Sequence, residues 1–150
     1  MKNNNWRKRA ILIAVFLAIF AHSALANGQI RMDLIRKIES NGVATAHRKT
    51  ATDESWGLYQ ITRICLDDYN MFHVKHYQVQ DLYDPNINTE IATWYLQVRI
   101  PQMLRYYKVE VTTENILIAY NAGIGNARKG RIPEITRRYL VKYKKLEGGK

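Results

Sequence analysis

Glu39 is the residue of this sequence whose type and position best suit acid–base chemistry. Before it, Ile30, Leu34 and Ile38 recur every four residues, a spacing typical of an amphipathic helix. Asn41-Gly42 then supplies residue types that commonly end a helix. A carboxylate there meets the negative end of the helix dipole and apolar neighbours, which both raise its pKa. We therefore interpret Glu39 as a candidate general acid, the alternative being a solvated residue at a helix end.

Three further groups of residues have the chemistry expected of ligands for a neutral polar substrate. Gly57-Leu58-Tyr59-Gln60 combines a glycine, which permits close backbone approach, with an amide that donates and accepts hydrogen bonds. Tyr120-Asn121 ends another apolar run, and Tyr139 stands among basic residues. Amides, phenols and a single acid favour a carbohydrate groove over a phosphate or metal site. By pattern alone, both tyrosines also fit core packing, and Gln60 also fits a solvated helix position.

Metal and disulfide chemistry are disfavoured by the cysteines and histidines of the chain. The only cysteine, Cys65, has a spacing typical of a core position, and a single cysteine cannot form an intramolecular disulfide. The histidines, His22, His47, His73 and His76, lack a further acid or thiol at the spacing of metal ligands. We therefore expect no bound metal and no cofactor.

The N-terminal segment has the three parts of a secretory signal peptide. Residues 1–9 carry four basic side chains and no acid, residues 10–21 are almost wholly apolar, and Ala24-Leu25-Ala26 resembles a cleavage site. Because the apolar run is shorter than the roughly twenty residues that span a bilayer, a retained anchor is the weaker interpretation. We expect residues 1–26 to be removed, and residues 27–150 to be periplasmic or secreted without stable membrane insertion.

The chain is strongly basic, with a formal net charge of +10 that the loss of residues 1–26 reduces by four, to +6. A basic surface suits a polyanion, such as an acidic cell wall or the acidic face of a membrane. Nucleic acid has the same chemistry, but secretion makes it the least favoured of the three. We predict no nucleic-acid partner.

Hydropathy patterning predicts an all-α, predominantly helical domain without a sizeable sheet. Residues 41–56 are polar and too long for a simple connector, so they form a candidate functional loop. Pro101 is expected to interrupt one helix. Ile64 and Phe72 are expected on the buried side of another. The predicted helices cover residues 30–40 and begin near Leu58, at Asp84-Pro85, at Thr112 or Thr113, and at Pro133.

The candidate residues fall within five short blocks. These are Ile38-Glu39-Ser40, Gly57-Leu58-Tyr59-Gln60-Ile61, Asp84-Pro85 with Asn88, Ala119-Tyr120-Asn121-Ala122-Gly123, and Gly130-Arg131-Ile132-Pro133 followed by Thr136 and Tyr139. Their order and approximate spacing resemble the soluble lytic transglycosylase catalytic domain, from about residue 30 to residue 143. The resemblance implies a goose-lysozyme-like helical fold, with residues 27–150 as the catalytic domain. It also implies cleavage of peptidoglycan glycan strands between N-acetylmuramic acid and N-acetylglucosamine.

Within that resemblance Glu39 is the single catalytic residue, acting first as acid and then as base. The substrate's own N-acetyl oxygen or 6-hydroxyl replaces the second carboxylate of ordinary glycosidases, so the product is a 1,6-anhydromuramyl sugar. A secretion or conjugation apparatus is a candidate partner for a small enzyme of this kind. The substrate-binding residues implied are Ser40, Gly57, Leu58, Tyr59, Gln60, Tyr120, Asn121 and Tyr139.

Two alternatives remain open from the residues themselves. Asp53 or Glu54 can polarise a water molecule as a second acid, which predicts a hydrolytic muramidase of lysozyme type. A non-catalytic protein that binds the cell wall would need the groove but not the acid, and the presence of Glu39 argues against it.

Overall fold

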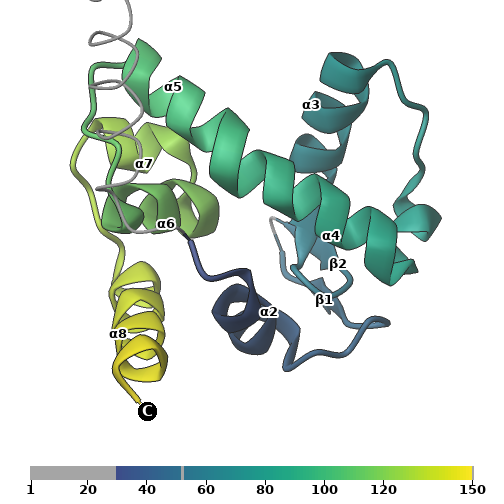
Figure 1. Cartoon of the computed structure of the whole chain (residues 1–150), viewed down its shortest axis with the longest axis horizontal. Coiled ribbons are helices and arrows are strands. Elements are labelled where there is room, and N and C mark those ends of the chain that lie inside the picture. The colour runs from purple at the N-terminus through teal and green to yellow at the C-terminus, as the bar shows by residue number, and fades with distance from the viewer. Residues whose placement is uncertain (1–29, 52, 150) are drawn as a thin grey trace, which may run out of the picture.

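Helices dominate the fold, as the patterning predicts (Figure 1). The computed structural model describes residues 30–51 and 53–149, so the predicted signal peptide, residues 1–26, lies outside the described residues. Within these two ranges no helix is both long and apolar enough to cross a bilayer. The helical elements are α2 (Met32–Ser40), α3 (Arg63–His73), the 3-10 turn η1 (Val79–Tyr83), α4 (Pro85–Trp94), the π-turn η2 (Tyr95–Arg99), α5 (Ile100–Tyr106), α6 (Thr113–Ala122), α7 (Ile124–Arg128) and α8 (Glu134–Gly148).

A small antiparallel sheet occupies the segment for which the sequence predicts a loop and the start of a helix. Its order is β1 (His47–Lys49), β2 (Glu54–Trp56) and β3 (Ile61–Thr62). The rings of His47 and Trp56, which pair across β1 and β2, stack with their centroids 5.6 Å apart. Two or three residues are too few to show the alternating pattern of a strand. The all-α class therefore holds for the fold as a whole, but not for this segment.

Helix α3 begins at Arg63 instead of near Leu58 because Thr62 caps it. The Thr62 hydroxyl accepts a hydrogen bond from the backbone N–H of Cys65. This start turns Cys65, Leu66 and Tyr69 toward the core. The predicted burial of Ile64 and Phe72 is wrong, since these side chains are 76% and 49% exposed.

Helices α4, η2 and α5 are continuous through Pro101, where the sequence predicts an interruption. In the π-turn the N–H of Ile100 donates to the carbonyl of Tyr95, five residues earlier. The π-turn adds one residue to a helical turn, so side chains five residues apart lie on the same face there. The buried side chains follow this spacing, five residues apart at the π-turn and four apart after it. They are Ile91, Leu96, Ile100 and Leu104, all fully buried.

The C-terminal helices begin and end close to their predicted positions. The Thr112 hydroxyl caps α6 by accepting from the N–H of Asn115 at 3.1 Å, and α6 ends at Ala122, just before Gly123 with its φ of +84°. Helix α8 follows Pro133, as predicted. The short helix α7 lies between α6 and α8, in a glycine-containing segment for which the sequence predicts no helix.

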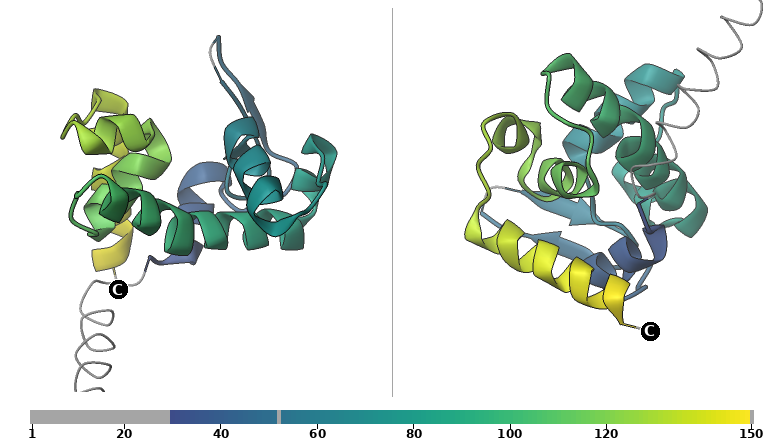
Figure 2. Two further views of the ribbon diagram at one scale, coloured as in Figure 1. Left: turned by 90° about the horizontal axis from the view of Figure 1, so that it is seen from above. Right: turned by 60° about the vertical axis from the view of Figure 1, so that its left-hand side comes forward.

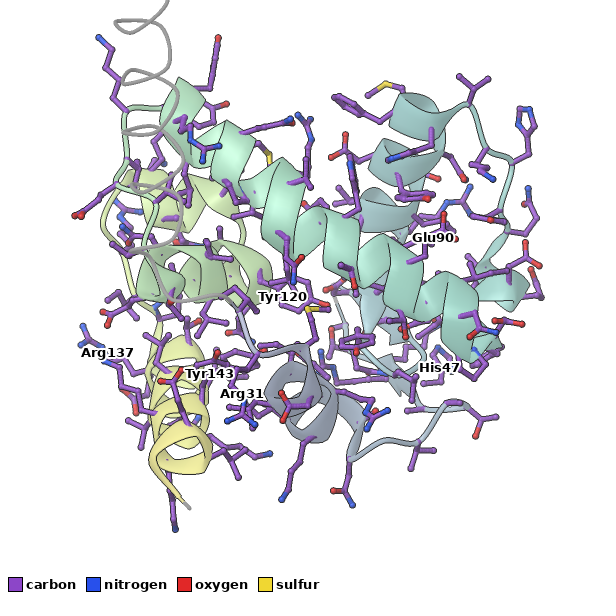
Figure 3. The ribbon with its side chains drawn as sticks, viewed as in Figure 1. Arg31, His47, Glu90, Tyr120, Arg137 and Tyr143 are labelled. Carbon is purple, nitrogen blue, oxygen red and sulfur yellow. The ribbon has the colours of Figure 1, made fainter. Side chains whose placement is uncertain are left out.

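Helix α2 is held at both ends between the sheet and the C-terminal helices (Figure 2). At its start, the backbone N–H of Arg31 donates to the hydroxyl of Tyr143 in α8 at 3.1 Å (Figure 3). At its end, the Ser40 hydroxyl donates to the carbonyl of Leu58, before β3, at 2.8 Å. Glu39 is the penultimate residue of this doubly fixed helix.

Candidate active site

Glu39 is buried although it is an acid at the end of a helix, since only 6% of its side chain is exposed. Burial raises the pKa of Glu39 from 4.5 to about 6. Three neighbours oppose this rise, namely the charge of Arg48, the hydroxyl of Tyr139 and, least, the charge of Lys142. The sequence correctly predicted a raised pKa. Burial is the dominant cause in the structure.

Two cavities meet at Glu39. The α8 cavity, about 500 Å³, lies among α2, β1 and α8, whereas the α6 cavity, about 410 Å³, lies among β3, α3 and α6. Glu39, Arg48 and Gln60 line both. A strand-like ligand that occupies the two cavities therefore passes directly over the buried carboxyl group.

The turn formed by residues 57–60 supports this junction from behind. Gly57 has a φ of +77°, and a Cβ atom there would lie 2.2 Å from both the Asn88 amide nitrogen and the Leu82 carbonyl oxygen. The side chain of Asn88, itself 1% exposed, accepts from the N–H of Tyr59 and donates to the carbonyls of Trp56 and Leu82. Only glycine fits this packing, and Asn88 fixes the shape of the turn.

Gln60 at the end of this turn directs its amide inward. Its nitrogen donates to the carbonyls of Ala46 and Gly57, and its oxygen accepts from the Ser55 hydroxyl at 3.0 Å. Gln60 is only 6% exposed. Its main contribution is to hold β1, which carries Arg48, next to Glu39.

Helix α6 supplies the opposite wall and is tied to the turn and to α8. The Tyr120 hydroxyl donates to the carbonyl of Tyr59 at 2.6 Å, and Asn121 accepts at 2.8 Å from the buried hydroxyl of Thr136. Burial raises the pKa of Tyr120 well above its ordinary value, so it stays a neutral donor. These bonds place Tyr120 and Asn121 in the lining of the α6 cavity.

Tyr139 from α8 is the direct neighbour of the acid. Its hydroxyl lowers the pKa of Glu39, while burial and Glu39 raise the pKa of Tyr139 far above its ordinary value. In the described ranges the Tyr139 hydroxyl nevertheless has no partner, Glu39 included, with the geometry of a hydrogen bond. It is the only buried side-chain nitrogen or oxygen there without one. A buried donor in this state is available to ionised Glu39.

Comparison with protein families decides what kind of domain this is. Residues 24–134, more than half of the chain, match the family described as Transglycosylase SLT domain. The chain belongs to this family. Comparison with curated proteins and with solved structures gave no match. The SLT domain confirms the resemblance and the lysozyme-like helical fold, and it implies peptidoglycan-cleaving lytic transglycosylase activity.

The residues predicted for the site of this SLT domain differ in their position relative to the two cavities. Ser40 lines the α8 cavity, Tyr120 and Asn121 line the α6 cavity, and Gln60 lines both with Glu39. Tyr139 acts on Glu39 directly. Neither cavity is lined by the turn residues Gly57, Leu58 and Tyr59. The side chains of Leu58 and Tyr59 are buried in the core.

Three residues of the SLT-domain site were missed from the sequence. Arg48 lies with its guanidinium 3.9 Å from the Glu39 carboxylate, Lys142 from α8 lines the α8 cavity, and Tyr95 from the π-turn lines the α6 cavity. Each comes from an element whose position relative to α2 depends on the tertiary fold. Nothing in the local sequence marks them out.

Asp53 and Glu54, the two acids of the predicted loop, lie in different surroundings where β1 is connected to β2. Asp53 lines the α6 cavity together with Glu39, whereas Glu54 lines neither cavity at Glu39 and forms an ion pair of 2.7 Å with Lys49. Lys49 lowers the pKa of Glu54. In residues 30–51 and 53–149 no group of three or more His, Cys, Asp or Glu residues is arranged to hold a metal ion.

Proposed function

We propose that this SLT domain cleaves the β-1,4 bond between N-acetylmuramic acid and N-acetylglucosamine with Glu39 as its single acid and base. The observation that carries the proposal is the placement of one buried carboxyl group, with a pKa of about 6, where two cavities meet. A group with this pKa is half protonated at about pH 6, so it can donate a proton there and can also accept one later.

Glu39 gives up one proton in the first step of the proposed reaction and regains one in the second. Glu39 first protonates the glycosidic oxygen, and the bond from that oxygen to C1 of the muramic acid breaks. The substrate's N-acetyl oxygen stabilises C1, after which the 6-hydroxyl attacks C1 and gives its proton to Glu39. The product is a 1,6-anhydromuramyl end, no water is consumed, and Glu39 returns to its starting state.

The free hydroxyl of Tyr139 supports this scheme. A neutral phenol beside the carboxyl can donate to Glu39 while it is ionised, between the two proton transfers. Arg48 and Lys142 stabilise the same ionised state by their charge. The carboxylate is thus supported at the one stage of the reaction when it is charged in a buried position.

A hydrolytic muramidase is the second candidate, and one observation favours it. Asp53 lines the α6 cavity with Glu39, so it can act on a water molecule held there. Glu54, which pairs with Lys49 outside this cavity, is the weaker choice for that role.

Mass spectrometry of the fragments released from purified peptidoglycan separates these functions. The wild-type protein is expected to release 1,6-anhydromuropeptides, and Glu39→Gln, which keeps the shape but not the proton, is expected to release none. Reducing-end products that Asp53→Asn abolishes would establish the muramidase. Wall binding without any release by the wild type would establish a non-catalytic wall-binding protein.

The remaining expectations concern where the protein acts. We propose a periplasmic or secreted protein with peptidoglycan strands as its partner, supported by the signal-like sequence of residues 1–26. Wall turnover, local opening of the wall for a secretion or conjugation apparatus, and phage infection are the candidate cellular roles. Comparing the mature N-terminus of the exported protein with Asn27 tests the signal cleavage.

A further inference from the structure

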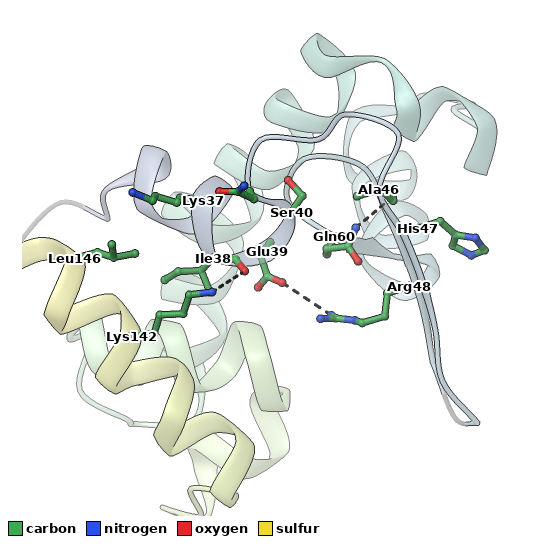
Figure 4. A pocket seen from close by; sticks show the side chains of 11 residues that line it. Lys37, Ile38, Glu39, Ser40, Ala46, His47, Arg48, Gln60, Lys142 and Leu146 are labelled. Carbon is green, nitrogen blue, oxygen red and sulfur yellow. Dashed lines mark hydrogen bonds and ion pairs between the residues drawn. The ribbon is translucent and has the colours of Figure 1, made fainter.

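The α8 cavity is far more basic than cleavage of a sugar bond requires (Figure 4). Three permanent cations line it, Lys37 from α2, Arg48 from β1 and Lys142 from α8. The only carboxyl group in its lining is Glu39. When Glu39 is protonated for catalysis, the cavity presents three positive charges and no negative one.

In residues 30–51 and 53–149 neither Lys37 nor Lys142 forms an ion pair. The ammonium group of Lys142 lies 3.5 Å from the carbonyl oxygen of Ile38, which directs it across the cavity toward α2 (Figure 4). By contrast Lys144, two residues further along α8, pairs with Glu114 at 2.9 Å. Lysines without an ion-pair partner in the lining of a concave site indicate an anionic ligand.

We propose that the α8 cavity binds carboxylates of the stem peptide on the glycan strand, so that the protein acts faster on strands whose stem peptides carry free carboxylates. This inference rests on the proposed function, because the strand must cross Glu39. Muramic acid alternates with glucosamine, so a strand in that position carries a peptide on each side of the scissile bond. The peptide's free carboxylates accept charge-assisted hydrogen bonds from lysine and arginine.

The shape and position of the cavity favour this ligand over a general polyanion. A membrane surface or a nucleic acid would bind a broad exposed face, whereas Lys37, Arg48 and Lys142 border a hollow that contains the catalytic carboxyl. A ligand bound there is positioned relative to Glu39. A group covalently attached to the substrate meets that condition.

The test compares two preparations of the same glycan strands, with native stem peptides and with the peptide carboxylates converted to amides. For wild type we expect kcat/KM for anhydro-product formation to be at least about tenfold higher on native strands, the equivalent of one charge-assisted contact. The double variant Lys37→Gln/Lys142→Gln is expected to reduce this ratio to near one. The charge-retaining variant Lys37→Arg/Lys142→Arg is expected to preserve it.

The ratio is measured within each variant because Lys142 also affects the pKa of Glu39. A change in that pKa alters both rates alike and leaves their ratio unchanged. Lys145→Gln is the matched control, since Lys145 is an exposed residue of the same helix that does not line the cavity. It is expected to keep the wild-type ratio. Circular dichroism and thermal unfolding confirm that each variant is folded.

Equal rates on the two preparations for wild type would overturn the proposal, as would a double variant that keeps the preference. A separate measurement keeps this failure distinct from failure of the proposed function. Co-sedimentation of Glu39→Gln with each preparation reports binding without catalysis. Selective binding to native strands would support the cavity assignment even if the wild type released no anhydro product, and unselective binding would contradict it.

Discussion

The pKa of Glu39 results from burial, which raises it, and from three neighbouring groups, which lower it. Arg48 is the largest of the lowering influences and is itself 57% exposed, so it can be replaced without opening the core. The balance has a functional consequence. An acid with a much higher pKa would donate its proton poorly at the first step, whereas a solvated acid would already be ionised before that step.

Activity is therefore expected to depend on pH through Glu39. Because the first step needs the protonated acid, kcat/KM should fall as pH rises above about 6. Arg48→Gln removes a charge that favours the ionised form, so the midpoint of this fall should move to higher pH. The pH profile of anhydro-product release measures it. Arg63→Gln, whose side chain pairs with Asp67, is the control that should leave the midpoint unchanged. An unchanged midpoint in Arg48→Gln would contradict the assigned coupling.

The same raised pKa predicts a cost in stability. Since Glu39 binds its proton more tightly in the folded than in the unfolded protein, its contribution to the free energy of unfolding is greatest below pH 4.5 and falls as pH rises through 6. Above that, the loss amounts to about 2 kcal/mol. Glu39→Gln cannot ionise, so it should be more stable than wild type by up to about this amount above pH 6, with the difference vanishing below pH 4.5. Chemical unfolding across this range measures it. A variant less stable at every pH would show that the carboxylate is not strained.

At the scale of elements, the sequence predicted best where a residue acts locally. Thr112 caps α6 and Pro133 precedes α8 through short-range geometry that residue type alone determines. The hairpin and the π-turn depend on partners instead. His47 lies in a strand and stacks on Trp56 of the neighbouring strand. The continuous helix formed by α4, η2 and α5 passes through Pro101 because its buried residues are five positions apart at the π-turn. Local patterning does not contain either relation.

The turn of residues 57–60 offers a sharp test at this scale. Gly57→Ala adds a Cβ atom where the Leu82 carbonyl and the Asn88 amide already lie, at a φ of +77°. Steric overlap and strain together should lower the free energy of unfolding by about 2–5 kcal/mol. Gly42→Ala is the matched control, because its φ is +83° but nothing lies within 4 Å of the added atom. It should cost only about 1–2 kcal/mol. Equal losses in the two variants would mean that Asn88 does not constrain the turn.

At the scale of the whole molecule, the site is assembled from parts far apart in the sequence. Glu39 from α2 and Gln60 from the turn line both cavities, and Tyr120 from α6 lines one of them. Helix α8 lies almost wholly beyond the SLT match, which ends at residue 134, yet it carries Tyr139 and Lys142. The packing of α8 on α2 therefore contributes to the electrostatic environment of Glu39.

Tyr143 tests this connection, because it is 1% exposed and its hydroxyl accepts from the N–H of Arg31 at the start of α2. Tyr143→Phe removes only that acceptor and should cost about 1 kcal/mol of unfolding free energy. Tyr143→Ala also removes the ring and should cost about 3–5 kcal/mol. Tyr106→Ala, at an 80% exposed position, should change stability by less than about 0.5 kcal/mol.

A variant that loosens α8 tests whether this helix affects the pKa of Glu39 or contributes only to the stability of the fold. If α8 keeps Glu39 buried, Tyr143→Ala at a temperature where it remains folded should lower the pKa of Glu39 from about 6 toward 4.5. The fall in kcat/KM should then begin at lower pH. Tyr143→Phe, which retains the ring, should keep the wild-type profile. A Tyr143→Ala variant that is less stable but has an unchanged pH profile would show that α2 alone fixes the acid, and that α8 contributes only stability.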